Sequence, residues 1–397
     1  MPATDPLPKQ FSSAWIRFDR NELAGSFGDI GTDLPLIIAM IPAAGLHGST
    51  VFMVFGVLQI LTGILYGVPM PMQPLKAMAV LVITQKIPGD VLLGAGFAVA
   101  TVMLFLSVTG ALSWLSRMIP RCVIRGIQFG LGLSLASLAL REYVPSLGTN
   151  GYILAIVCFA IVVVLWGNRR IPASLLVILF GSLYASVVTI DWSTVHLAKS
   201  VELPTLDIPA WDAIWTGFIV LALPQIPLSL SNSVFATEQT LKDLFPERAI
   251  GVQKIGITYS MANFLASLLG GIPACHGCGG LAGHYAFGAR TGGSVVIYGT
   301  MYLVIGVLLG NSVDAVVAAY PRPVLGVILL FEAAMLMMLV RDMASDSKEF
   351  TVVLLVGLIA LGIKQGFLVG LLMGIAIWYF WEWRERHAGS PSTTHEM

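Results

Sequence analysis

Long apolar runs recur along this chain, and short breaks that carry polar residues, proline or glycine separate them. A helix needs about 20 apolar residues to cross the hydrocarbon core of a bilayer. The runs that reach or approach this length predict membrane-spanning helices near residues 24–44, 50–68, 91–116, 122–140, 150–166, 171–190, 212–237, 249–269, 294–318, 322–340, 349–363 and 365–383.

Two further apolar pieces, 72–85 and 275–289, are too short and too rich in proline or glycine to cross alone. We count them as half-helices, which gives fourteen segments. The composition agrees, because 56% of the residues are hydrophobic and only 11% are charged, whereas soluble domains carry about 25% charged residues. The sequence therefore predicts an all-α polytopic membrane protein within a lipid bilayer.

The charged residues indicate an orientation. With the N-terminus inside, sixteen of the 22 lysines and arginines fall in inside segments and five in outside loops. Basic residues favour the cytoplasmic side of a membrane. We therefore expect both ends, 1–20 and 387–397, to be cytoplasmic segments of a protein in the cell (inner) membrane. The formal net charge of zero gives no indication of a nucleic-acid partner.

Short motifs repeat at one spacing. "PRCVIRGI" at 120–127 resembles "PRPVLGVI" at 321–328, and "PMQP" at 71–74 precedes "PACH" at 273–276 by a similar distance. The same offset brings "GDIGT" at 28–32 onto "SLSNS" at 229–233. We interpret 21–200 and 201–386 as two repeats of seven segments each. Because seven is odd, the second repeat is inverted in the membrane, which is typical of secondary transporters with a site at the repeat interface.

The half-helices predict the position of that site. The first N–H groups of a helix lack intrahelical partners and carry partial positive charge. Two such ends at mid-depth would form a cradle for an anion. The residues at the two expected helix starts are Met72, Gln73, Pro74 and Leu75 in the first repeat, and Ala274, Cys275, His276, Gly277 and Cys278 in the second.

The Cys-His-Gly-Cys sequence at 275–278 has other readings. A structural zinc site needs four ligands, and the chain has no second Cys-x-x-Cys pair. A thioredoxin-like redox pair would need a soluble βαβ context. We expect no metal and no cofactor, and we interpret the two cysteines as small residues that line a half-helix. A membrane thiol oxidoreductase remains the alternative of another class.

Charged residues at membrane depth are costly and are usually paired or functional. Lys76 could neutralise part of a divalent anion or pair with Asp29. A carboxylate beside an anion would repel it unless protonated, so Asp29 is the first candidate for proton coupling. Asp33 is a further candidate for proton coupling, and a helix-capping or surface role is its alternative. Glu332 could hold a proton or make a buried polar contact.

Neutral hydrogen-bonding residues occur in the matching span of the second repeat. Their hydroxyl and amide groups suit oxyanion oxygens, and two prolines in "PQIPLSLSNS" predict a distorted helix. These candidate binding residues are Gln225, Ser229, Asn232 and Ser233.

Several of these stretches together resemble the molybdate transporter family, relatives of the sulfate permeases. The matching pieces are "FGDIGTDLPL", "PMPMQPLKA", "RGIQFGLGLS", "PQIPLSLSNSV" and "CHGCGGLAGHYAFGARTG". The resemblance implies the fold of uracil and sulfate permease relatives, with a core bundle of segments 1–4 and 8–11 and a gate bundle of segments 5–7 and 12–14. It also implies an elevator-like motion of core against gate. Matching the motifs adds Thr32 to the candidate site and supports Asp29, Gln73, Lys76, Gln225, Asn232, His276 and Gly277.

The sequence thus predicts a secondary active transporter, not an enzyme, that takes up molybdate and is driven by protons. Sulfate or a broader range of oxyanions is the alternative within this class, because molybdate and sulfate share charge and tetrahedral shape. The direction of transport, the coupling stoichiometry and a homodimeric state stay open at this point.

Overall fold

The computed structural model describes residues 15–165, 173–193, 195–196, 198, 203–248, 250–363 and 365–388. Nearly all regular structure in these residues is helical, as the hydrophobic pattern predicts. The elements are α1 (Arg20–Gly25), α2 (Ile30–Ala44), α3 (Gly48–Tyr66), β1 (Met72–Pro74), α4 (Lys76–Gln85), α5 (Gly89–Val108), α6 (Leu112–Met118), α7 (Arg121–Leu138), η1 (Ala139–Tyr143), η2 (Val144–Leu147), α8 (Gly148–Val164), α9 (Ala173–Tyr184), η3 (Ala185–Thr189), α10 (Trp211–Gly217), η4 (Phe218–Ala222), α11 (Leu223–Leu228), η5 (Ser229–Phe235), α12 (Ala236–Leu244), α13 (Val252–Leu268), β2 (Ala274–His276), α14 (Cys278–Ala286), α15 (Gly293–Leu309), α16 (Ser312–Ala319), α17 (Arg322–Met338), η6 (Leu339–Met343), α18 (Ser347–Gly362) and α19 (Gly366–Ala388).

Several helical stretches are long and apolar enough to cross a membrane. In the part of the chain that the structure describes there are six, or seven if the bent pair α15 and α16 counts as one. The axes of that pair differ by 111°, so the span expected over 294–318 is sharply bent between Leu309 and Ser312. The expected spans 24–44 and 91–116 are also divided, because α1 ends before α2 begins and α5 ends at Val108, two residues before Gly110 turns with a φ of 74°.

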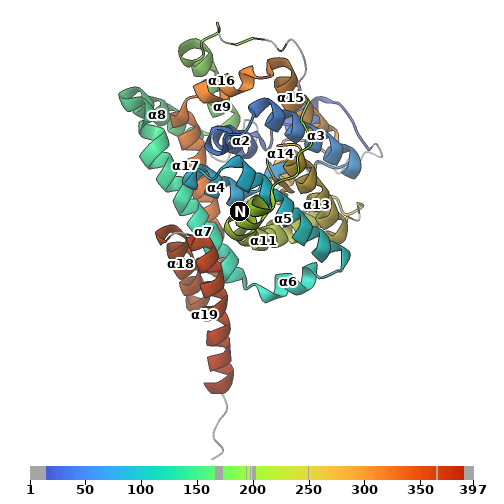
Figure 1. The fold of residues 1–397 in the computed structure, drawn as a ribbon, viewed down its shortest axis with the longest axis vertical. Coiled ribbons are helices and arrows are strands. Elements are labelled where there is room, and N and C mark those ends of the chain that lie inside the picture. The colour runs from blue at the N-terminus through green and yellow to red at the C-terminus, as the bar shows by residue number, and fades with distance from the viewer. Residues whose placement is uncertain are drawn as a thin grey trace, which may run out of the picture.

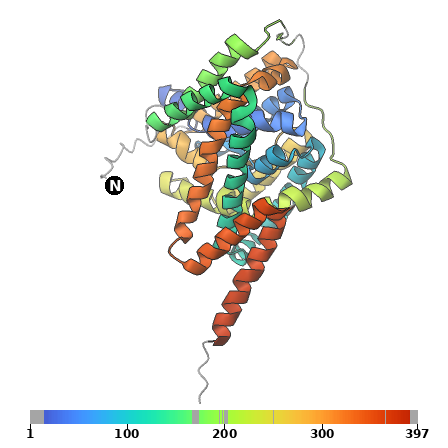
Figure 2. The same ribbon diagram turned by 90° about the vertical axis from the view of Figure 1, so that its left-hand side faces the viewer.

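The helices form two groups. On one side, α3 packs against α15 and α5 packs against α13; on the other, α7 packs against α17 and α18, and α17 packs against α8 (Figure 1). The C-terminal helix α19 contacts α18 and projects beyond the other helices in both views (Figure 2). Some of the arginines and lysines behind the orientation argument lie outside the described residues, namely Lys9, Arg169, Arg170, Lys199 and Lys364.

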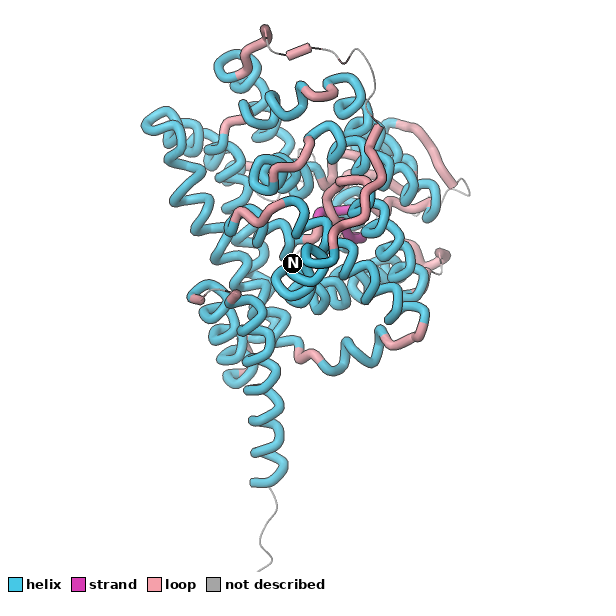
Figure 3. Tube along the Cα trace, viewed as in Figure 1, coloured by secondary structure: helices cyan, strands magenta, loops and turns pink. Residues whose placement is uncertain are grey.

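One feature departs from an all-α fold. β1 and β2 form a two-stranded antiparallel ribbon among the helices (Figure 3), and the register is Met72 with His276, Gln73 with Cys275 and Pro74 with Ala274. The prolines explain the local extension, because a residue that precedes proline is pushed towards β geometry. The all-helical prediction is therefore wrong here, where prolines and glycines keep both segments from starting as helices.

Two amides complete the ribbon's outer edges. Gln59 on α3 accepts a hydrogen bond from the Met72 N–H at 2.9 Å and donates to the Met72 carbonyl at 2.7 Å. Asn263 on α13 binds the N–H and carbonyl of Ala274 in the same way, at 3.0 and 2.7 Å. Buried backbone groups need hydrogen-bond partners. These two side chains provide them and so stabilise a strand pair of three residues inside the protein.

Candidate functional site

The two half-helices begin later than the sequence predicted. α4 starts at Lys76 and α14 at Cys278, each directly after a ribbon strand. The prolines lie within or before the strands instead of in the first helical turn. The expected cradle over 72–75 is therefore wrong, since its backbone N–H groups are engaged by Gln59 and by the ribbon, and proline has none.

The ribbon also uses the amide of Cys275. The Leu75 N–H donates to the Pro273 carbonyl at 3.0 Å, and bonded and non-bonded pairs alternate in an antiparallel ladder. Leu75 and Pro273 are a hydrogen-bonded pair, and the next pair, Pro74 and Ala274, is not. Gln73 and Cys275 therefore form the next hydrogen-bonded pair. The backbone donors left for a ligand lie after the strand, in the first turn of α14.

The first turns of α4 and α14 differ. The Gln225 carbonyl oxygen Oε1 accepts from the N–H of Ala77 at 2.9 Å and of Met78 at 3.4 Å, so a side chain already occupies the start of α4. Gln225 is held in turn, because its Nε2 donates to the Ser229 hydroxyl at 3.0 Å. The N-cap residue of α14, Gly277, has no side chain, and no side chain among the described residues accepts a hydrogen bond from the first N–H groups of this helix. Of the two helix starts, that of α14 is the one open to an anion.

A cavity of about 180 Å³ lies at this open helix start. Gly277, Cys278 and Gly279 border it, and a methyl group added at Gly279 would meet nothing within 4 Å. The other lining residues are Gln73, Lys76, Gln128, Leu131, Gln225, Leu228, Asn232, Ser233, Cys275, His276, Leu336 and Leu339. Backbone donors and a lysine are thus combined with apolar walls, as is usual for a small-ligand site.

The imidazole of His276 is engaged elsewhere. Alternate residues of a strand point to opposite faces, so His276 lies opposite Met72 on the face away from Gln73. Its Nε2 is 2.9 Å from the Thr258 hydroxyl, and its ring stands edge-on to the Tyr66 ring with 5.3 Å between centroids. The sequence predicts His276 as a site residue; in the structure its Nε2 already has Thr258 as a partner, and its Nδ1 is buried without one.

Asp29 lies over the start of α14. Its two carboxylate oxygens each lie 2.7 Å from Gln73 Nε2. A methyl group added at Gly280 would lie 2.3 Å from Asp29 Oδ2, so the carboxylate packs directly on the first turn of the helix. A negative charge is stabilised at that position by the helix dipole. It would also repel a second anion bound there.

The other two candidate acids are Asp33 on α2 and Glu332 on α17. Asp33, one turn further along α2, accepts from the Tyr298 hydroxyl at 3.4 Å and is fully buried. Its side chain therefore neither caps the helix nor lies on its surface. The amino group of Lys76 lies 2.5 Å from Glu332 Oε1 on α17. The sequence suggested Asp29 as the ion-pair partner of Lys76; the structure instead pairs Lys76 with Glu332 and Asp29 with Gln73.

Most of the predicted residues come together. Gln73, Lys76, Gln225, Asn232, Ser233, Cys275, His276, Gly277 and Cys278 border the 180 Å³ cavity. Thr32 and Glu332 line a separate cavity of about 280 Å³. Pro74, Leu75 and Ser229 line neither; Ser229 instead hydrogen-bonds Gln225 and the Tyr259 hydroxyl. Gln128 also lines the 180 Å³ cavity and was not among the predicted site residues.

The cysteines are all free thiols where the structure describes them. Cys275 is buried, and Cys278 is partly exposed. Among the described residues, no group of three or more histidine, cysteine, aspartate or glutamate side chains could hold a metal ion.

Known proteins match this chain over most of its length. The profile of a family described as "Molybdate transporter of MFS superfamily" matches residues 21–135 and 217–336. The chain belongs to this family. Molybdate transporter 1 of Arabidopsis thaliana is 32% identical, over 90% of this chain and 88% of its own length. Molybdate transporter 1 of Chlamydomonas reinhardtii is 26% identical, over 91% and 92%.

Solved structures show the same fold at low identity. The transmembrane domain of the cyanobacterial bicarbonate transporter BicA matches with a TM-score of 0.65 and 16% identity, over 91% of this chain and 98% of that one. The murine anion transporter Slc26a9 in its inward-facing state matches with a TM-score of 0.68 and 14% identity, over 96% and 70%. This member of the molybdate transporter family is therefore a multi-pass integral membrane transporter with a sulfate-permease-like fold.

Proposed function

We propose that this protein takes up molybdate, and that the anion binds in the 180 Å³ cavity at the start of α14. The observation that carries the proposal is the uncapped first turn of α14, which opens into this cavity beside Lys76. A helix N-terminus offers N–H donors and partial positive charge to an anion. Asn232 and Ser233 add neutral side-chain donors on the η5 side of the cavity.

The substrate competes with two carboxylates in this arrangement. Asp29 lies on the helix start that would receive the anion, and Glu332 holds the amino group of Lys76. Binding a dianion becomes favourable when one or both of these acids take up a proton. This supports coupling of molybdate entry to proton entry, with Asp29 and Glu332 as the proton carriers and the buried Asp33 next in line.

The transport movement is an elevator-like displacement of a core bundle against a gate bundle. In this proposal the helices form fourteen segments in two inverted sets of seven, and α4 and α14 are the half-helices. Both ends of the chain lie on the cytoplasmic side. Packing supports this division: α3 with α15 and α5 with α13 belong to the core, and α7 with α17 and α18 to the gate. The Lys76–Glu332 pair then bridges the two bundles, because α4 is core and α17 is gate.

A membrane thiol oxidoreductase based on Cys275 and Cys278 is the competing function of another class. Replacing both cysteines by serine tests it, since serine keeps the small volume and removes the redox chemistry. We expect uptake to be retained, because the proposed site is built on the backbone of α14. Complete loss of function in a folded double variant would favour the thiol reading.

Direct binding to the purified protein tests the function itself. Equilibrium dialysis with molybdate and with sulfate, each alone and in competition, separates molybdate uptake from sulfate or broad oxyanion uptake. We expect saturable molybdate binding that sulfate displaces poorly. Equal displacement by sulfate would favour the broader permease, and failure to bind either anion would contradict the proposed function.

A further inference from the structure

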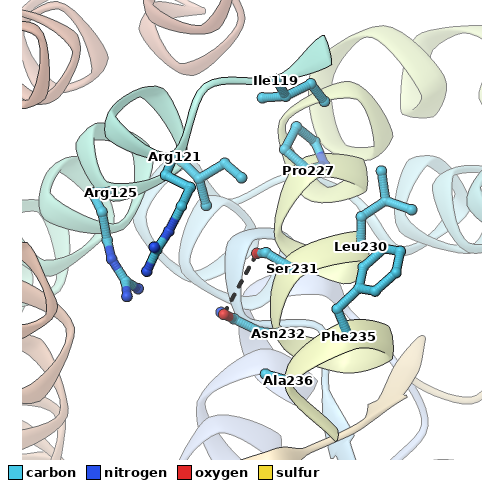
Figure 4. A pocket seen from close by; sticks show the side chains of 10 residues that line it. Ile119, Arg121, Arg125, Pro227, Leu230, Ser231, Asn232, Phe235 and Ala236 are labelled. Atoms are coloured by element: carbon cyan, nitrogen blue, oxygen red, sulfur yellow. Dashed lines mark hydrogen bonds between the residues drawn. The ribbon is translucent and has the colours of Figure 1, made fainter. Parts of the chain in front are cut away.

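A second, larger cavity adjoins the candidate site. It has a volume of about 370 Å³ and lies between α7 and the α11–η5 stretch (Figure 4). Asn232 borders both cavities. We call the larger space the outer cavity, and the 180 Å³ cavity at the start of α14 the inner cavity. On α7, Arg125 lines the outer cavity, and Gln128, about one turn further along, lines the inner cavity. The two spaces are therefore consecutive along the same pair of helical stretches.

The outer cavity carries excess positive charge. Arg121 and Arg125 extend from α7 towards the space in front of Ser231 and Asn232 (Figure 4), and no acid is among the lining residues. Both guanidinium groups contact one carboxylate outside the lining, Asp342 on η6, at 3.3 Å from Arg121 Nη2 and 2.6 Å from Arg125 Nη2. One carboxylate cannot neutralise two arginines, so the cavity favours an anion.

Gln128, next along α7, indicates that an anion leaving the outer cavity would find an unpaired donor in the inner cavity. Arg125 Nη1 donates to Gln128 Oε1 at 2.9 Å, which fixes the orientation of the amide. The opposite atom, Gln128 Nε2, is buried without a hydrogen-bond partner, and the residue is only 1% exposed. A buried donor without an acceptor is destabilising. Since Gln128 lines the inner cavity, an acceptor atom of a bound molecule there would satisfy it.

We propose that the outer cavity is a second binding site for a tetrahedral oxyanion, placed on the route to the inner site. Arg125, with Arg121 beside it, supplies the charge, and Gln128 and Asn232 receive the anion where the two cavities meet. Guanidinium groups bind oxyanions through paired, charge-assisted hydrogen bonds. Asp342 competes for Arg125, which keeps binding weak enough for the anion to move on. This inference rests on the proposed function of oxyanion transport.

The alternative is an ordinary ion pair that only ties α7 to η6. Opposite charge changes separate the two explanations. If the cavity binds an anion, Arg125→Gln removes attraction and Asp342→Asn removes competition, so the two variants change affinity in opposite directions. If the pair is structural, both variants loosen the same contact and shift any property in the same direction.

The experiment is calorimetric titration of molybdate into the purified full-length protein, with two classes of site resolved. We expect Arg125→Gln to weaken the lower-affinity class by about tenfold and Asp342→Asn to tighten it by about threefold. Gln128→Leu should weaken the higher-affinity class and leave the lower one. Arg117→Gln is the matched control, because Arg117 is an exposed arginine on the neighbouring helix α6 and lines neither cavity.

Each outcome decides one question. Opposite shifts for Arg125→Gln and Asp342→Asn, with an unchanged control, support the second site. If wild-type protein binds molybdate and both variants match it or shift the same way, the second site is wrong and the proposed function stands. If wild-type protein binds neither molybdate nor sulfate, both proposals fail together. Melting curves of each variant identify losses that come from misfolding.

Discussion

Gln59 and Asn263 hold opposite edges of the ribbon by the same pair of hydrogen bonds. Each side-chain amide accepts from one backbone N–H and donates to the carbonyl of the same residue, Met72 for Gln59 and Ala274 for Asn263. Both amides are fully buried. A side-chain amide matches the donor and acceptor of a strand edge, so each acts as a short extra strand. The two starts of the half-helices are thereby fixed relative to α3 and α13.

Removing either amide should destabilise the protein. Gln59→Leu or Asn263→Leu leaves a buried N–H and a buried carbonyl unpaired, and we expect a loss of about 2 kcal/mol or more. The apparent melting temperature in detergent measures this. Gln239→Leu is the control, because Gln239 is exposed and its amide donates to Asp243. A melting temperature for Gln59→Leu equal to that of the control would contradict the strand-edge role.

Two neighbouring glycines in α14 should respond differently to the same substitution. A methyl group at Gly280 would lie 2.3 Å from Asp29 Oδ2 and 2.7 Å from Pro71, so Gly280→Ala forces the carboxylate or the chain to move. A methyl group at Gly279 meets nothing and projects into open space at the cavity. We expect Gly279→Ala to fold normally yet bind molybdate about tenfold more weakly, because it screens the helix amides.

The comparison is made by binding and melting curves on both variants. Gly280→Ala should lower the melting temperature as well as binding. If Gly279→Ala binds molybdate as the wild-type protein does, the anion does not lie against the first turn of α14.

The Lys76–Glu332 pair should report on substrate competition. Lys76→Met removes the lysine that borders the inner cavity, and we expect binding to weaken by about tenfold or more. Glu332→Gln frees the lysine for the anion, and we expect affinity to rise about threefold and to depend less on pH. Dialysis across a pH series measures both. A Glu332→Gln variant with weaker binding would show that the carboxylate supports the site instead of competing for it.

The hydrophobic pattern identified most helices because apolar runs of bilayer length have few other uses. It could not identify the ribbon, because β1 and β2 have three residues each and lie about 200 positions apart, too short for any period. "PMQP" and "PACH" lie where the sequence predicts the starts of the half-helices. The same prolines also favour extended backbone, and only the buried Gln59 and Asn263, which could pair with a strand edge, pointed to that reading.

The candidate site was predictable in membership and unpredictable in pairing. The spacing of the motifs predicted that one site contains Gln73, Lys76, Gln225 and Asn232, and all four line one cavity. Which acid meets Lys76 depends on how α17 is rotated against α4, and a single sequence does not encode that rotation in any local pattern. Gln225 likewise belongs to the cavity, yet its Oε1 caps α4, which hydrogen-bonding capacity alone did not predict.

Asp29→Asn tests proton coupling most directly. The carboxylate lies on the first turn of α14 and accepts from Gln73 Nε2 at 2.7 Å, so an asparagine of equal size can keep this contact through its oxygen while losing the charge. In proteoliposomes with an inward proton gradient, we expect the variant to bind molybdate and exchange it across the membrane. We expect accumulation against a molybdate gradient to be lost, because no proton then needs to accompany the anion. Asp90→Asn is the control, because Asp90 is exposed and does not line the inner cavity. Undiminished accumulation with the wild-type pH dependence in Asp29→Asn would exclude Asp29 as the coupling residue and would leave Asp33 or Glu332 to carry the proton.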